Sequence, residues 1–183
     1  DRLALVWGYI FHLAAFLSAL YALHVKDALQ HVSGAIYAGT AIGAVFAGDL
    51  ITLFVYWELT AISSVFLVWA NRTEASYRSG MRYLLIQVGS GVILLSGVLL
   101  HFRDTGSIDF NHLGMGSTAT LLILLAFGIK CAFPFLHNWL QDAYPQATPT
   151  GTVFLSAFTT KLAVYALARG FAGTEELVYI GAA

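Results

Sequence analysis

Long apolar runs separated by short polar segments dominate this sequence and limit what it can fold into. A bilayer core of roughly 30 Å is crossed by about 20 apolar residues in a helix. Runs of this kind, bounded by charges, glycine or proline, recur along the chain. Six spans are predicted, over residues 3–23, 32–48, 50–70, 82–102, 117–140 and 150–170. The predicted fold class is therefore an all-α polytopic membrane protein with about six transmembrane helices.

The composition agrees with a membrane protein and argues against several other classes. Hydrophobic residues make up 58% of the chain and charged residues 10%, which is less than half the charged share that is usual in soluble domains. The formal net charge is -1 and the Lys and Arg residues are scattered, so we expect no nucleic-acid partner. Cys131 is the single cysteine, without a Cys/His cluster around it, so we expect no metal and no other cofactor.

Three formally charged residues lie well inside the predicted spans: Glu58, Lys130 and Lys161. A charge at the centre of a membrane helix costs about 2.5 to 3.5 kcal/mol on insertion scales, so each needs a compensating reason. The positions that share a helix face with Glu58 are apolar, so its partner must come from another span. We predict a proton relay in which the position of Glu58 changes the proton affinity of Lys130. The alternative is a static ion-pair network that fixes the register of the helices.

Pro134 predicts that the fifth span is broken. A proline cannot donate to the carbonyl four residues back, which here belongs to Lys130, so the helix should kink or break beside that lysine. Irregular backbone at membrane depth is tolerated where it is buried in protein or lines a wet cavity. The i, i+4, i+7 spacing also predicts that Lys130, Pro134 and His137 share one helix face. That face would place a lysine and an imidazole along one proton path.

Four further polar residues are weaker candidates, and each has two interpretations. His12, in the middle of the first span, is either a packed or snorkelling histidine or a relay group. Asp49, between the second and third spans, either caps the third helix or collects cations at an entrance. Gln87 and Ser90 in the fourth span could bond water or a neighbouring helix.

Small residues and loop charges indicate how the spans are arranged. Gly39 and Gly43 in the second span form a pattern that lets helices approach closely. Thr148 as an N-cap with Pro149 in the first turn predicts the start of the sixth span. The balance of basic residues in the short loops favours a cytoplasmic position for residues 71–82.

Four strings in the chain resemble the antiporter-like membrane subunits shared by respiratory complex I, membrane-bound hydrogenases and the Mrp multisubunit Na+/H+ antiporters. They are FAGDLITLFVYWEL (46–59), MRYLLIQ (81–87), GIKCAFPFLHNWLQDAYPQATPTG (128–151) and LSAFTTKLAVYALAR (155–169). The most specific features are the glutamate in WEL, the lysine before P-x-x-H-x-W-L and the lysine in T-K-x-x-x-Y. Within the family the chain is most similar to the D-type subunit of the Mrp antiporters.

The resemblance implies roles for the three charged residues and a division of the chain. Glu58 and Lys130 would be the ion-paired glutamate and lysine of the family, and Lys161 its central relay lysine. His137 matches a family position to which we carry over no catalytic role, and His12 has no family role.

The resemblance also implies a five-helix half-channel unit over residues 32–170, which contains the broken helix. Residues 1–31 would be a preceding transmembrane helix and loop, and residues 171–183 the start of the next segment. A second, inverted unit would follow and supply the exit. Because the chain begins at Asp1 rather than Met, we expect it to be a piece of a longer protein.

The function predicted from these features is proton conduction in a multisubunit Na+/H+ antiporter, which is a transporter rather than an enzyme. The ions would be H+ and Na+, the partners other membrane subunits and the lipid bilayer, and the location the cell inner membrane. One alternative is a pumping subunit of a redox-driven quinone or hydrogen oxidoreductase. Another is a scaffold subunit that conducts nothing.

Overall fold

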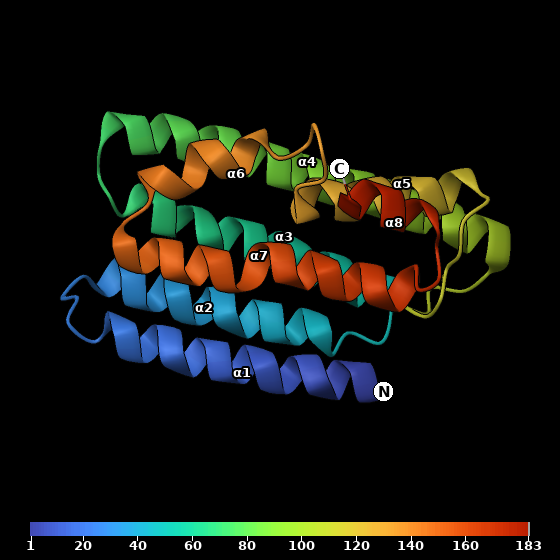
Figure 1. Ribbon diagram of the computed structural model, residues 1–183, viewed down its shortest axis with the longest axis horizontal. Helices are drawn as coiled ribbons and strands as arrows, with labels where there is room; N and C mark the ends of the chain where they lie inside the picture. Colours follow the sequence, from blue (N-terminus) through green and yellow to red (C-terminus); the bar gives the residue numbers. More distant parts are fainter. Residues whose placement is uncertain (183) are drawn as a thin grey trace.

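The computed structural model describes residues 1–182, and the regular structure in that range is helical (Figure 1). The elements are α1 (Arg2–Ala22), α2 (Ala28–Val45), α3 (Leu50–Trp69), α4 (Glu74–Thr105), α5 (Thr118–Cys131), α6 (Asn138–Ala143), the 3-10 helix η1 (Tyr144–Gln146), α7 (Pro149–Gly170) and α8 (Glu176–Ala182). By length and composition α1, α3, α4 and α7 are able to cross a membrane, and α5 is a shorter apolar helix. The predicted all-α polytopic membrane class is confirmed.

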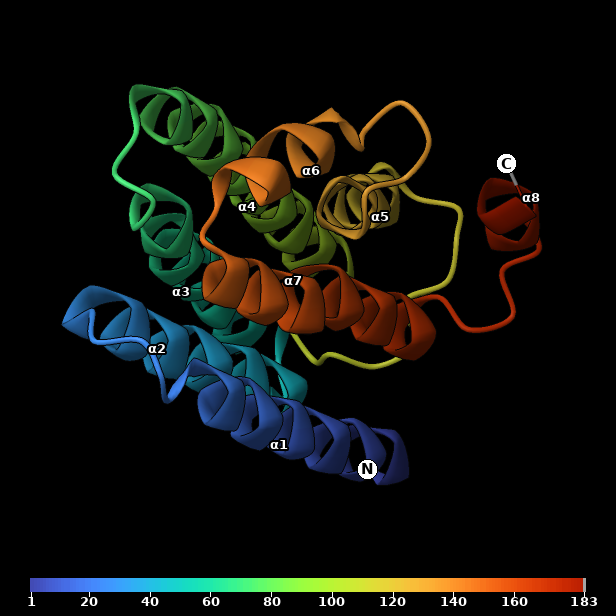
Figure 2. The same ribbon diagram turned by 60° about the vertical axis from the view of Figure 1, so that its left-hand side comes forward.

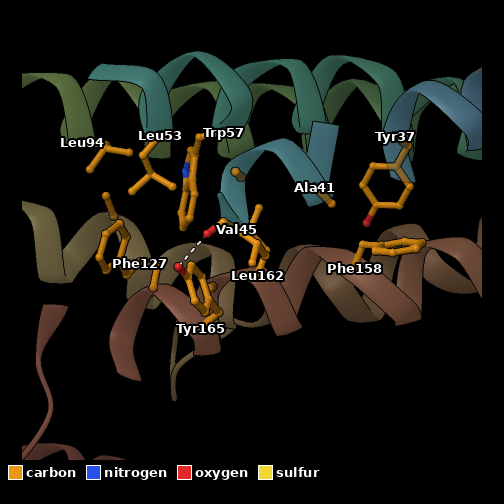
Figure 3. Packing of buried hydrophobic residues seen from close by; sticks show 14 of the residues in the cluster. Tyr37, Ala41, Val45, Leu53, Trp57, Leu94, Phe127, Phe158, Leu162 and Tyr165 are labelled. Atoms are coloured by element: carbon orange, nitrogen blue, oxygen red, sulfur yellow. Dashed lines mark hydrogen bonds between the residues drawn. The ribbon is translucent and has the colours of Figure 1, made fainter. Parts of the chain in front are cut away.

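The long helices lie side by side, with α7 at the centre of the bundle. Helix α7 contacts α1, α2, α3 and α5, while α4 packs between α3 and α5. Aromatic side chains from these helices fill the interior, among them Tyr37, Trp57, Phe127 and Phe158 (Figure 3). Helix α8 stands apart from the bundle on the side of α5 (Figure 2). Burial of apolar and aromatic surface between helices therefore fixes the positions of α3, α4, α5 and α7, which carry the candidate site.

Side-chain caps set the helix starts. The Thr148 hydroxyl accepts a hydrogen bond from the Gly151 N–H at 3.0 Å, with Pro149 in the first turn, as predicted. Helix α4 begins eight residues earlier than the predicted span, at Glu74 rather than at residue 82, because Thr73 and Ser76 form a capping box there. Residues 74–81 lie outside the predicted span because several of them are polar. They nevertheless continue the helix beyond its apolar part.

The fifth predicted span is broken, and the break is wider than a kink. Helix α5 ends at Cys131, and Ala132 and Phe135 both have a positive φ, of 62° and 67°. The Phe133 N–H donates to the Gly128 carbonyl at 2.9 Å, which closes the helix end before the proline is reached. The predicted break is confirmed.

The predicted common face of Lys130, Pro134 and His137 is wrong. The chain leaves the helix at Ala132 and becomes helical again only at Asn138. Helical spacing therefore does not relate the three positions, and His137 instead stands directly before α6.

The glycine pattern of α2 serves packing at one of its two positions. A Cβ added to Gly43 would lie 2.5 Å from the Tyr56 ring, so this glycine lets α3 approach α2 closely. A Cβ at Gly39 would meet nothing within 4 Å. The packing prediction is thus confirmed for Gly43 and not for Gly39.

Candidate functional site

Lys130 lies in the last turn of α5 and is fully buried. Its Nζ donates a hydrogen bond to the Trp57 carbonyl at 3.0 Å and lies 4.5 Å from the centroid of the Trp57 ring. A carbonyl oxygen and the face of an indole both stabilise a cation in a dry interior. The C-terminal position adds the favourable end of the helix dipole. Helices α3 and α5 therefore provide a specific cation site for this lysine.

Glu58 follows Trp57 in α3, so the two residues predicted to be partners lie on adjacent helices. The described residues nevertheless contain no direct ion pair between Glu58 and Lys130, since the lysine is bonded to the backbone beside the glutamate. Oε1 of Glu58 is buried and has no hydrogen-bond partner among residues 1–182. The carboxylate is thus near the lysine without being fixed to it.

Helix α4 forms the third wall of the site. A Cβ at Gly91 would overlap the Glu58 carboxylate, so the missing side chain makes room for that group. The preceding residue, Ser90, accepts from Trp57 Nε1 at 3.1 Å through its Oγ and donates to the Ala126 carbonyl at 3.0 Å. Ser90 therefore bonds neighbouring helices and fixes the indole that covers Lys130.

Gln87 lies one turn before Ser90 on α4 and is fully buried. Neither its Nε2 nor its Oε1 has a hydrogen-bond partner within the described part of the chain. A buried carboxamide is normally bonded, because an unpaired polar group in a protein interior is costly. Its interaction with a neighbouring helix, one of the two predicted roles, is therefore not seen.

Trp139 closes the broken end of α5. Its indole Nε1 donates to the Ile129 carbonyl at 2.9 Å, and the ring is almost fully buried against Tyr83 and Tyr144. The Ile129 carbonyl, one residue before Lys130, also accepts the Ala132 N–H at 3.2 Å, so the indole adds a second donor at the end of the helix. Helix α6 is in this way folded back onto the site.

Lys161 lies on an exposed face of α7 and forms no ion pair with Glu58 in the described range. It is an electrostatic neighbour of Cys131, at the end of α5. Next to that end is a cavity of about 530 Å³ between the broken helix, α7 and α8, lined in part by Cys131, Pro134 and His137. The structure therefore places His137 at the break, and Lys161 outside the cluster of Glu58 and Lys130.

The remaining predicted residues occupy local positions. His12 is exposed on α1, and its Nδ1 lies 2.7 Å from the Gly8 carbonyl of the same helix. Asp49 caps α3 by accepting hydrogen bonds from the Thr52 N–H and hydroxyl, both at 2.7 Å. Burial works to raise the pKa of Asp49, but these bonds and one from the Ile51 N–H leave it below its ordinary value. Of the two interpretations of Asp49, the cap is observed.

Three residues of the site were not singled out from the sequence: Trp57, Gly91 and Trp139. Trp57 stands beside Glu58 in the string WEL, but its carbonyl and ring gain a role only when α5 is packed against α3. Gly91 follows Gln87 by one helical turn, which is the one sequence signal that could have pointed to it. Trp139 stands in the string P-x-x-H-x-W-L, but nothing in that string indicates its bond to the end of α5.

Comparison with known proteins places this arrangement in a family. Residues 47–179 match the family described as NADH:quinone oxidoreductase/Mrp antiporter, TM. The chain belongs to this family. Glu58, Lys130 and Lys161 all lie within the matched range, and the predicted family is confirmed. As a member, the chain is an embedded, multi-pass membrane protein, in agreement with its apolar helices.

Individual relatives come from several kinds of complex. An A-type Na(+)/H(+) antiporter subunit from Alkalihalophilus pseudofirmus is 32% identical over 160 residues, which are 79% of this chain and 20% of the relative. Hydrogenase-4 component B of Escherichia coli is 27% identical over 141 residues, covering 73% of this chain and 21% of the relative. A chain in the structure of the Mrp complex from Dietzia sp. DQ12-45-1b has a TM-score of 0.82 at 26% identity, covering 99% of this chain and 37% of the other.

The family member described here therefore spans about a fifth of the length of these curated relatives. It spans a little over a third of the matched chain in the Mrp complex. The predicted similarity to the D-type subunit stays a prediction, because the antiporter relative named above is of the A type.

Proposed function

We propose that this chain is part of a proton-conducting subunit of a multisubunit Na+/H+ antiporter in the cell inner membrane, and that Glu58 and Lys130 carry the protons. The observation that carries the proposal is the fully buried Lys130, placed beside a glutamate whose Oε1 has no hydrogen-bond partner within residues 1–182. Ionisable groups inside a membrane are rare and belong to ion pathways or proton relays. The family, and the antiporter names among its members, support the same function.

The contacts of Lys130 suit a group that gains and loses a proton. The Trp57 carbonyl can accept a hydrogen bond from either an ammonium or a neutral amine, so the side chain stays in place in both states. The Glu58 carboxylate supplies a negative charge that is not fixed to the lysine. Movement of this carboxylate toward or away from Lys130 would change how firmly the lysine holds its proton.

Lys161 and His137 enter the proposal as later groups on the path. Both lie next to the broken end of α5, His137 in the lining of the cavity and Lys161 on the exposed face of α7 beside Cys131. We propose that residues 32–170 form one half-channel and that a following part of the subunit covers this face. His12 is left out of the route, because it is exposed on α1 and bonded to its own helix.

The test is ion transport by the full complex in everted vesicles, with proton and sodium movement measured separately. Lys130→Ala and Glu58→Gln should abolish proton movement in normally assembled complex, whereas the exposed loop variant Lys26→Ala should transport normally. Loss of sodium exchange with unimpaired proton flux would overturn the assigned route. A static ion-pair network instead predicts that activity falls in step with the amount of folded complex, and a scaffold subunit predicts intact transport.

A second candidate function is supported by the similarity to Hydrogenase-4 component B and by the family description itself. In this case the chain would belong to the pumping part of a redox-driven NADH or hydrogen oxidoreductase. Purification of the tagged protein with its partner subunits distinguishes the two. Small antiporter subunits support the first function, and hydrogenase or NADH-oxidising subunits support the second.

A further inference from the structure

Helix α4 carries a buried polar stripe that leads away from Glu58. Tyr83, Gln87, Ser90 and Gly91 follow one another at i, i+4, i+7 and i+8, so they share one face. All four are buried. The Gly91 end of the stripe touches the Glu58 carboxylate. The Tyr83 end points toward the side of the bundle where η1 contacts α4.

The Tyr83 end of the stripe belongs to a group of buried hydroxyls, here named the Tyr83 cluster: Tyr37, Ser64, Tyr83 and Thr159. The Tyr83 hydroxyl is hydrogen-bonded to Ser64 Oγ at 2.7 Å. The Tyr37 hydroxyl is hydrogen-bonded to the Thr159 hydroxyl, and the Thr159 side chain also lies next to the Tyr83 hydroxyl. These residues come from α2, α3, α4 and α7, so four helices converge on hydroxyl groups in the middle of an apolar bundle.

Tyr144 of η1 connects the Tyr83 cluster to the end of the bundle. Burial, and then the neighbouring Tyr83 hydroxyl, raise the pKa of Tyr144 well above its ordinary value. Its own hydroxyl donates to the Leu155 carbonyl at 2.8 Å, and the Tyr37 hydroxyl donates to the same carbonyl at 3.4 Å. The hydroxyls of Tyr144 and Tyr37 thus meet at one backbone carbonyl, so polar groups extend from η1, at the end of the bundle, to the Tyr83 cluster.

Gln87 is the group between this cluster and Glu58. It lies one turn from Tyr83 and one turn from Gly91, and both of its amide atoms are buried without a partner among the described residues. A leucine would fill a similar volume without unpaired polar atoms, so packing alone does not account for a glutamine here. A carboxamide with a free donor and a free acceptor has the groups needed to bind water in a polar site.

We propose that Gln87 binds water between the Tyr83 cluster and Glu58, which makes this stripe the access route by which protons reach Glu58 from the η1 side. The inference rests on the proposed function. Gln87 acts as a positioning residue and stays neutral. For each proton that a bound water passes to the Glu58 carboxylate, that water accepts one from the hydrogen-bonded chain on the side of Tyr83. Only O–H bonds are exchanged, and no co-reactant is needed.

The experiment measures proton flux and thermal stability of the full complex for Gln87→Leu and Tyr83→Phe. A positioned proton-transfer group contributes on the order of 10²- to 10⁴-fold, and a residue that only holds the water should contribute less. We expect proton flux to fall about tenfold or more in both variants. Gln87→Leu should be about as stable as the wild type, because it removes the carboxamide together with the water that the carboxamide binds and leaves an apolar side chain of similar volume.

Matched variants separate a water-binding role from packing. Gln87→Ser keeps a hydroxyl and leaves room for additional water, so it should recover a large part of the flux lost in Gln87→Leu. Ser63→Ala removes another buried hydroxyl, one that bonds only its own helix at the apolar groove between α2 and α3, and should transport normally.

The outcomes distinguish this inference from the proposed function. If Glu58→Gln and Lys130→Ala are inactive while Gln87→Leu and Tyr83→Phe transport at the wild-type rate, the access route is wrong and the proposed function stands. If Glu58→Gln and Lys130→Ala transport normally, the proposed function fails first. If Gln87→Leu does not assemble, Tyr83→Phe decides the question, because it removes a single hydroxyl from a ring that remains packed.

Discussion

Replacement of Gly91 by alanine tests whether the position of the Glu58 carboxylate matters. Gly91 is buried on α4, and an added Cβ would overlap Oε1 of Glu58, lie 2.5 Å from its Cδ and 3.3 Å from its Cγ. All three of these nearest atoms belong to one side chain, and none is backbone. We therefore expect Glu58 to move aside while the helices stay in place.

The expected magnitudes differ between stability and transport. Alanine favours a helix interior over glycine by about 1 kcal/mol, and overpacking of a core costs about 1 to 3 kcal/mol. Because a flexible side chain takes up the overlap, these terms largely cancel, and the free energy of unfolding should change by less than about 2 kcal/mol. In Gly91→Ala, however, Oε1 of Glu58 must move until it lies at least 3.4 Å, an ordinary contact distance, from the new Cβ. A misplacement on the order of 1 Å can slow a positioned reaction about a hundredfold, so we expect proton flux to fall at least about tenfold.

The assay is proton uptake in everted vesicles, normalised to the amount of assembled complex and accompanied by its thermal unfolding temperature. Gly89→Ala is the matched control, because it lies on the same helix, gains the same helix propensity and places its Cβ within 4 Å of nothing. Gly91→Ala should lose transport with little change in stability, and Gly89→Ala should lose neither. Normal transport by Gly91→Ala would show that the observed position of Glu58 is not required.

Three further predictions concern single contacts. Trp139→Phe removes one of the two donors to the Ile129 carbonyl, the Ala132 N–H being the other, and should lower stability by about 1 kcal/mol, measured as a lower unfolding temperature of the purified complex. Tyr165→Phe leaves the Val45 carbonyl, now bonded at 2.7 Å (Figure 3), without that donor, and a loss of about 1 kcal/mol is expected in the same assay. Asp49→Ser should keep the α3 cap and normal sodium exchange, whereas weaker sodium binding would support a cation entrance. Folding lowers the pKa of Asp49 below its ordinary 3.8, so the ionised carboxylate stabilises the folded wild type above pH 3.8. This stabilisation is lost as the pH falls below 3.8 toward the lowered pKa. The stability of Asp49→Ser should lack this pH dependence.

The sequence predicts the long apolar helices and the break. Apolar runs of membrane length and the position of Pro134 predicted six helical segments and an interruption after Lys130, because both depend on local chemistry. Helix starts were predicted where a capping residue stands beside an apolar run, as at Thr148. The start of α4 was missed, because polar residues that continue a helix outside the apolar region look like a loop in a search for spans.

The geometry of the site depended on packing that the sequence does not report. The cost of a charge in the membrane predicts a lysine from another span near Glu58. It does not predict that the lysine bonds the Trp57 carbonyl instead of the carboxylate. The shared face of Lys130 and His137 assumed a helix that continues through the proline. Six non-helical residues instead separate α5 from α6, so the positions beyond the break had to be read from the structure.

The contrast between a surface ion pair and the buried Glu58 and Lys130 argues against a purely structural role for the buried charges. Helix α6 is joined to α4 by a bidentate ion pair between Arg82 and Asp142. Both distances from donor nitrogen to acceptor oxygen are 2.8 Å. Arginine stays protonated and its planar group holds a carboxylate in one geometry, which is what helix register requires. At the buried site the base is a lysine, whose proton affinity responds readily to its surroundings. It is bonded to a neutral carbonyl, and Oε1 of Glu58 has no hydrogen-bond partner in the described part of the chain. A purely structural pair at that depth would be stabilised most by a bidentate arginine and carboxylate. A group that must release a proton instead needs a base such as Lys130, which no carboxylate among residues 1–182 holds in the charged state.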